Sequence, residues 1–129
     1  MTALRAGVIV LVLFLASGST ASIPPRIAII IDDLGYRLAA GRRAIELPGP
    51  VSFAVLPGAP KARLLAVEAF ERGKEVLLHL PLQASPNDTE QEPLGIRLDT
   101  SRQEFRQLFE LALTSVPHAI GVNGHRGTV

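Results

Sequence analysis

The sequence contains no cysteine. This absence excludes disulfide bonds, zinc sites built on thiolates and a cysteine nucleophile. Any metal ion bound by this protein must therefore be held by histidine and carboxylate side chains.

An excess of charge of either sign is also lacking, because 13 basic residues are balanced by 12 acidic ones and the formal net charge is +1. Aromatic residues make up only 5% of the chain, and none of them alternate with a basic stripe. Both features argue against nucleic acid as a partner. The length of 129 residues and the hydrophobic fraction of 47% fit one domain with a substantial core.

Residues 1–21 have the pattern of a cleaved signal peptide. Arg5 gives a positively charged start, residues 6–16 form an unbroken apolar run, and residues 19–21 are small, as at a cleavage site. The apolar run is shorter than the roughly 20 residues that a membrane span needs. We therefore expect an exported protein, periplasmic or extracellular, with no stable membrane span after cleavage and a mature domain at residues 22–129.

An apolar stretch followed by two aspartates organises the rest of the chain. Residues 27–31 are consecutive apolar residues, mostly β-branched, which predicts a strand buried on both faces of a parallel sheet. Asp32 and Asp33 follow at the end of this strand. Because ligands collect at the carboxyl ends of strands in parallel α/β sheets, these carboxylates are the first candidates for chemistry.

Helices and strands alternate along the remaining sequence. Apolar residues at helical spacing, a capping pattern at Ser101 and Glu104, short apolar runs, and bounding prolines and glycines mark the elements. The expected strands are 26–31, 51–56, 75–78 and 119–122, and the expected helices are 38–47, 60–72 and 101–116. Residues 83–98 are polar and predict a long loop. This order predicts an α/β fold with a parallel sheet and right-handed crossovers.

Two histidines follow strands in the same way as the aspartates. His79 follows the third expected strand and His125 the fourth, so both should reach the sheet edge where Asp32 and Asp33 emerge. Two imidazoles and a carboxylate at one edge suit a divalent metal such as zinc, with an open position for water. Taken singly, each residue also has a structural interpretation, as a turn or helix cap or as a hydrogen-bonded histidine. His118 starts the last strand at the opposite edge and is expected to be structural or solvated.

Four segments in the same order resemble the divergent polysaccharide deacetylase family. They are residues 27–35 (IAIIIDDLG), 47–51 (LPGPV), 75–82 (EVLLHLPL) and 116–125 (VPHAIGVNGH). The resemblance extends over almost all of the sequence after the signal peptide. It implies a variant, often incomplete, (β/α) barrel. Because the family fold normally continues with further strands, we expect this chain to hold the N-terminal portion and to be truncated at the C-terminus.

The resemblance also implies roles for individual residues. In the related metal-dependent deacetylases one aspartate of the pair is the base and the next binds the metal, which makes Asp32 the expected catalytic base and Asp33 a metal ligand. His79 and His125 complete the expected ligand set. The implied activity is that of a metal-dependent hydrolase, with zinc as the expected divalent ion, that removes acetyl groups from a cell-envelope polysaccharide.

Two other hypotheses stay open at this point. Position 83, where the main deacetylase family has its second histidine, is Gln83 in this sequence. This favours a non-catalytic envelope carbohydrate-binding or interaction protein on a deacetylase-like scaffold. The end of the chain at Val129 also fits an inactive truncated fragment. The presence of both aspartates and both histidines favours the enzyme.

Overall fold

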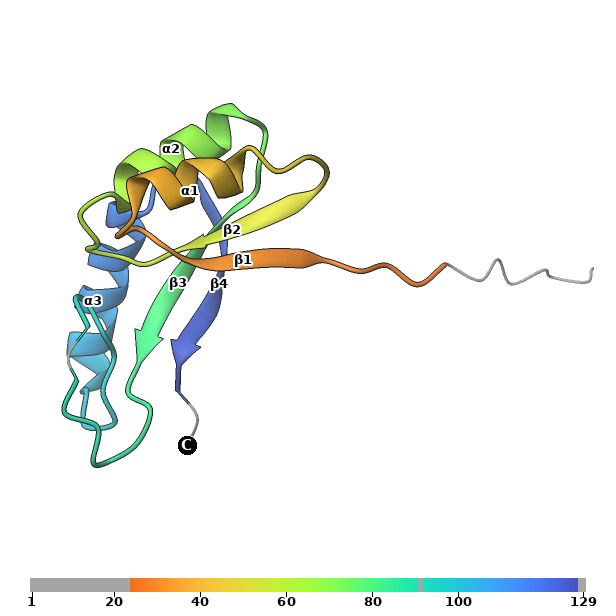
Figure 1. The fold of residues 1–129 in the computed structure, drawn as a ribbon. Coiled ribbons are helices and arrows are strands. Elements are labelled where there is room, and N and C mark those ends of the chain that lie inside the picture. Colours follow the sequence, from red (N-terminus) through yellow and green to blue (C-terminus); the bar gives the residue numbers. More distant parts are fainter. Residues whose placement is uncertain (1–23, 91, 128–129) are drawn as a thin grey trace, which may run out of the picture.

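A computed structural model describes residues 24–90 and 92–127. These residues form a four-stranded parallel sheet with a helix in each connection between strands. The spatial order of the strands is β1-β2-β3-β4, the same as their order in the sequence (Figure 1). The elements are β1 (Ile29–Leu34), α1 (Leu38–Ile45), β2 (Val51–Val55), α2 (Ala62–Glu71), β3 (Val76–Leu82), α3 (Arg102–Ser115) and β4 (Ala119–Arg126). The predicted α/β fold of alternating units is confirmed. The predicted signal peptide lies outside the described residues.

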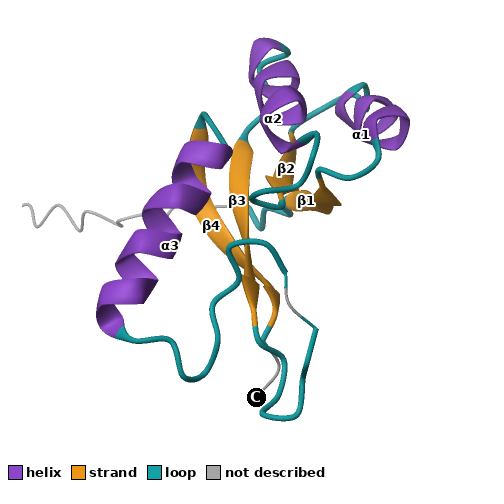
Figure 2. Cartoon of the chain, turned by 90° about the vertical axis from the view of Figure 1, so that its left-hand side faces the viewer, coloured by secondary structure: helices purple, strands orange, loops and turns teal. Residues whose placement is uncertain are grey.

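The three helices lie on one face of the sheet (Figure 2). Sequential strand order combined with right-handed crossovers places every connecting helix on the same side. Alternate residues of β2 and β3 point to that side and pack against buried residues of α2 and of the end of α3. This core contains Val51, Phe53, Val55, Val76, Leu78 and Leu80 from the strands and Leu65, Ala66, Ala69, Ala112 and Val116 from the helical side.

The prediction that the first strand is buried on both faces is wrong. Ile29 and Ile30 of β1 are exposed, Ile31 is half-buried, and only Leu34 is buried. The physical reason is the position of the strand, because β1 forms an edge of the sheet and pairs only with β2. An apolar run alone does not distinguish an edge strand from a central one.

The third and fourth strands are longer than predicted. Their parallel pairing continues from Leu77↔Gly121 to Leu82↔Arg126, so His79 and His125 lie inside β3 and β4 instead of after them. β2 has already ended, since its last pair with β3 joins Val55 to Leu78. The final part of β3 therefore has a strand neighbour only on the β4 side.

The long loop predicted at residues 83–98 is present and connects β3 to α3. Its two ends are tied together, because the Gln83 N–H donates to the Ile96 carbonyl and the Ile96 N–H donates to the Pro81 carbonyl, both at 2.8 Å. The predicted cap of α3 also forms, with the Ser101 Oγ accepting from the Glu104 N–H at 3.2 Å. None of the helices in the part of the chain that the structure describes is long and apolar enough to cross a membrane.

Asp88 holds the middle of this loop. Its carboxylate accepts hydrogen bonds from the Ala84 N–H (3.2 Å), the Glu90 N–H (3.1 Å) and the Arg126 guanidinium (2.7 Å). The Ala84 N–H lowers the pKa of Asp88 most, the Glu90 N–H and Arg126 lower it further, and burial acts in the opposite direction. The ionised form of Asp88 is thus the form that the folded loop favours.

Two phenylalanines that differ in burial allow the contribution of the core to stability to be tested with the same substitution. Phe53 is fully buried in the core, whereas Phe105 on α3 is 40% exposed. We expect Phe53→Ala to lower the free energy of unfolding by about 3–5 kcal/mol, the usual cost of deleting a buried ring. Phe105→Ala should cost roughly 1 kcal/mol or less. Urea unfolding of both variants tests the described core, and equal losses would contradict it.

The low pKa of Asp88 predicts a pH-dependent contribution to stability. This contribution is complete above the pKa of an unfolded aspartate, about 3.9, and is lost as the pH falls through the lower folded value. The difference in free energy of unfolding between wild type and Asp88→Asn should therefore be largest near pH 5 and shrink towards about pH 2. Urea titrations across this range measure it. A difference that does not change with pH would show that the Asp88 charge is not stabilised by the fold.

Candidate metal centre

A bulge in β1 sets the direction of the Asp33 side chain. Ile31 pairs with Phe53 and Leu34 pairs with Val55, so Asp32 and Asp33 together face a single β2 residue, Ala54. Asp33 has a left-handed backbone conformation, with a φ of 59°. Aspartate tolerates this conformation better than most residues because its short polar side chain bonds locally. The bulge re-aims the Asp33 carboxylate towards β3 and β4.

His79 extends from the middle of β3 and is 3% exposed. Its Nδ1 lies 3.1 Å from the Oδ1 of Asn123 on β4. An amide oxygen only accepts hydrogen bonds, so Nδ1 carries the ring proton and donates it. The other ring nitrogen, Nε2, therefore has a free lone pair, and it lies 3.2 Å from Asp33 Oδ1.

His125 near the end of β4 completes a triangle of donor atoms. Its Nδ1 lies 3.0 Å from Asp33 Oδ1 and 3.1 Å from His79 Nε2. The two imidazole rings meet edge to face, with centroids 4.8 Å apart and an interplanar angle of 62°. The three expected ligands thus converge on one point, although they come from three different strands.

The spacing of these donor atoms fits a metal ion. Ligands of a tetrahedral zinc at about 2.0–2.1 Å are about 3.3 Å from one another, and those of an octahedral ion at the same distance about 3.0 Å. Hydrogen bonds among the three side chains do not account for this arrangement. Asp33 Oδ1 and His79 Nε2 are both acceptors, yet they face each other at 3.2 Å. A cation bound by all three atoms would relieve this contact. Two imidazoles and one carboxylate are typical ligands of zinc and of similar divalent ions.

The site is buried on one side and open on the other. The His79 side chain is enclosed, whereas the Asp33 side chain is 61% exposed. A bound ion would therefore have protein ligands beneath it and space for water or substrate towards the solvent. Asp32, the expected base, precedes Asp33 in the sequence, is exposed and lines a hollow together with Asp33 and Tyr36, but it is not one of the three converging residues.

His118 and Gln83, two polar residues considered in the sequence analysis, have structural roles. His118 lies at the start of β4, away from the site, and its ring stacks on Phe70 with centroids 3.8 Å apart. Gln83 closes the loop, since its Nε2 donates to the Ser85 carbonyl (2.8 Å) and its Oε1 accepts from the Leu98 N–H (3.0 Å). The second imidazole of the site therefore comes from His125.

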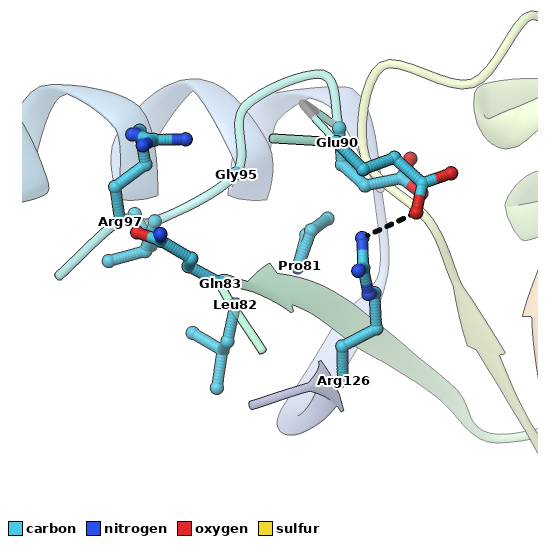
Figure 3. A pocket seen from close by; sticks show the side chains of 9 residues that line it. Pro81, Leu82, Gln83, Glu90, Gly95, Arg97 and Arg126 are labelled. Carbon is cyan, nitrogen blue, oxygen red and sulfur yellow. Dashed lines mark ion pairs between the residues drawn. The ribbon is translucent and has the colours of Figure 1, made fainter. Parts of the chain in front are cut away.

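Arg126 follows His125 directly, yet its charge is compensated by acidic residues. Its guanidinium pairs with Asp88 Oδ2 at 2.7 Å and with Glu90 Oε2 at 3.0 Å. Figure 3 shows the Arg126 side chain reaching towards the loop and meeting Glu90. These contacts tie the loop to the end of β4, along a cavity of about 120 Å³ that Pro81, Ile96 and Arg126 help to line.

Sequence reasoning missed three residues of this region. Asn123 orients His79, and Glu92 lies with its Oε1 3.8 Å from His125 Nε2. Tyr36 lies near Glu92, and its pKa is raised by burial first and then by the Glu92 carboxylate. Only Asn123 had a signal in the sequence, because it is two residues before His125 and so points to the same face of a strand.

Comparison with known proteins agrees with this architecture. The chain is 38% identical over 103 residues to the uncharacterized protein YibQ of Escherichia coli K12, covering 80% of this chain and 32% of YibQ. It is 34% identical over 103 residues to an uncharacterized protein of Haemophilus influenzae, covering 80% of this chain and 36% of the relative. The chain thus spans about a third of the length of these relatives.

The fold also matches a solved structure. A crystal structure of an uncharacterized protein from Agrobacterium tumefaciens C58 superposes with a TM-score of 0.71 at 20% identity, covering 78% of this chain and 42% of the other. At this identity the similarity concerns the fold alone. The family model for divergent polysaccharide deacetylases matches residues 29–129, a range that includes all three strands of the candidate metal centre. The chain belongs to the divergent polysaccharide deacetylase family.

Proposed function

We propose that this protein is a metal-dependent hydrolase that removes acetyl groups from a cell-envelope polysaccharide. The observation that carries the proposal is the convergence of Asp33 Oδ1, His79 Nε2 and His125 Nδ1 at 3.0–3.2 Å from one another. Membership of the deacetylase family supports an acetylated glycan as the substrate class. Zinc is the proposed ion, because the donor set is two imidazoles and a carboxylate.

The chain's own residues supply the binding and the proton transfer. Such an ion, when bound, would act as a Lewis acid on the acetyl carbonyl and lower the pKa of a coordinated water towards about 7. Asn123 fixes the His79 ring so that its Nε2 lone pair faces the centre. Asp32, exposed and next to Asp33 in the sequence, takes the proton of the attacking water as general base and passes it to the departing amine or alcohol.

We also propose that the protein acts outside the cytoplasm, in the periplasm or beyond. This rests on the signal-peptide pattern of residues 1–21 and on the expected substrate, a polymer of the cell envelope. The proposed mature domain is residues 22–129.

The metal centre is tested by elemental analysis of the purified protein. Wild type should contain a near-stoichiometric amount of zinc or a similar divalent ion, and Asp33→Ala and His79→Ala should lose it because each removes a ligand. His118→Ala is the matched control, because it also removes a histidine. His118 lies just before β4 and stacks on Phe70, away from the site. A folded wild-type protein without metal would overturn the enzyme in favour of a carbohydrate-binding scaffold.

The role of Asp32 is tested separately from metal binding. Asp32→Asn keeps the size of the side chain but removes the base, so metal content should stay at the wild-type level while acetate release from acetylated glycans falls by roughly 10²–10⁴-fold. Asp99→Asn provides the control, because Asp99 is exposed and pairs only with Arg97. Wild-type turnover in Asp32→Asn would rule out this residue as the base.

A further inference from the structure

The second ring nitrogen of His125 faces a carboxylate. His125 Nδ1 points at Asp33 and His79, while Nε2 on the other side of the ring lies 3.8 Å from Glu92 Oε1. Glu92 Oε1 is thus next to Nε2, at a distance longer than a formed hydrogen bond. Both side chains are largely buried, with exposures of 20% for His125 and 23% for Glu92.

Glu92 also lies near Tyr36, on the other edge of the sheet. Tyr36 is in the turn between β1 and α1, and the Glu92 carboxylate is close enough to raise the pKa of its hydroxyl. The carboxylate therefore lies between the end of β4 and the residues that follow the aspartate pair. Burial raises the pKa of Tyr36 most, and the neighbouring Glu92 carboxylate raises it further, so the neutral hydroxyl is favoured.

The loop that carries Glu92 is anchored beside His125. Arg126, the next residue of β4, binds Glu90 at 3.0 Å (Figure 3) and Asp88 at 2.7 Å, so two carboxylates just before Glu92 are fixed to the same strand as the histidine. Gln83 closes the base of the loop through its contact with the Leu98 N–H. Because the loop is fixed at these points, the fold places the Glu92 carboxylate beside His125 Nε2.

We propose that Glu92 is a positioning residue for His125. It accepts the Nε2–H of the ring, so that the proton stays on Nε2 and the Nδ1 lone pair faces Asp33 and His79. Asn123 performs the same task for His79, with an amide oxygen in place of a carboxylate. The role rests on the proposed metal site, and partners of this kind fix the ring orientation and raise the basicity of the ligating nitrogen.

Zinc affinity of matched variants tests the proposal. Glu92→Leu removes the acceptor and should weaken zinc binding by about 10–100-fold, measured by competition with a chelating dye. Glu92→Gln keeps an acceptor oxygen and should recover part of the loss. Glu71→Gln is the control, because Glu71 is an exposed glutamate at the end of α2, away from the candidate metal centre. Its zinc affinity should equal that of wild type.

Nuclear magnetic resonance of the zinc-loaded protein gives a readout that a purely structural role would not change. The Nε2–H of His125 should give a slowly exchanging resonance in wild type, a weaker one in Glu92→Gln and none in Glu92→Leu. Wild-type affinity and an unchanged ring resonance in Glu92→Leu would overturn the role of Glu92 while leaving the proposed function intact. Absence of zinc binding in wild type itself would overturn both proposals, so the two failures are distinguishable.

Discussion

One additional residue in β1 decides where the first carboxylate of the site points. In a strand with unbroken pairing, Asp32 and Asp33 would lie on opposite faces of the sheet. The bulge and the left-handed backbone at Asp33 turn its carboxylate towards His79 and His125. A non-glycine residue in this conformation costs roughly 1–3 kcal/mol, so it persists only where the surrounding fold holds it. Here the pairing of Leu34 with Val55 restores the register immediately after the bulge.

The two histidines depend on a different constraint, the length of the β3–β4 ladder. Because this pairing runs on past the end of β2, both rings are carried by regular strand backbone and not by a loop. Strand backbone holds side chains more precisely than loops do, which a metal site needs. Between β1 and β3, β2 contributes only the small Ala54 opposite the bulge, and this leaves Asp33 free to reach across to β3 and β4.

The polar residues around the centre form one connected set. Asn123 accepts a hydrogen bond from His79 Nδ1, and Glu92 faces His125 Nε2. The Arg126 guanidinium, which would repel a cation if it stood alone, is compensated by Asp88 and Glu90. Among the described residues, no buried side-chain nitrogen or oxygen lacks a hydrogen-bond partner. These contacts orient the side chains around the centre, whereas the close approach of the two acceptors Asp33 Oδ1 and His79 Nε2 is the contact that a bound cation would relieve.

The sequence by itself determined the α/β fold, the order of its elements and the candidate residues Asp32, Asp33, His79 and His125, because apolar periodicity and strand ends are local patterns. The family resemblance then selected Asp33 as the expected ligand. The burial of β1 was predicted wrongly, since neighbours far along the chain decide whether a strand lies at an edge. Only the tertiary structure revealed the bulge, the continuation of β3 and β4 through the histidines, and the partners Asn123 and Glu92. These features depend on register and on loop anchoring, and both are fixed by contacts between residues that are remote in the sequence.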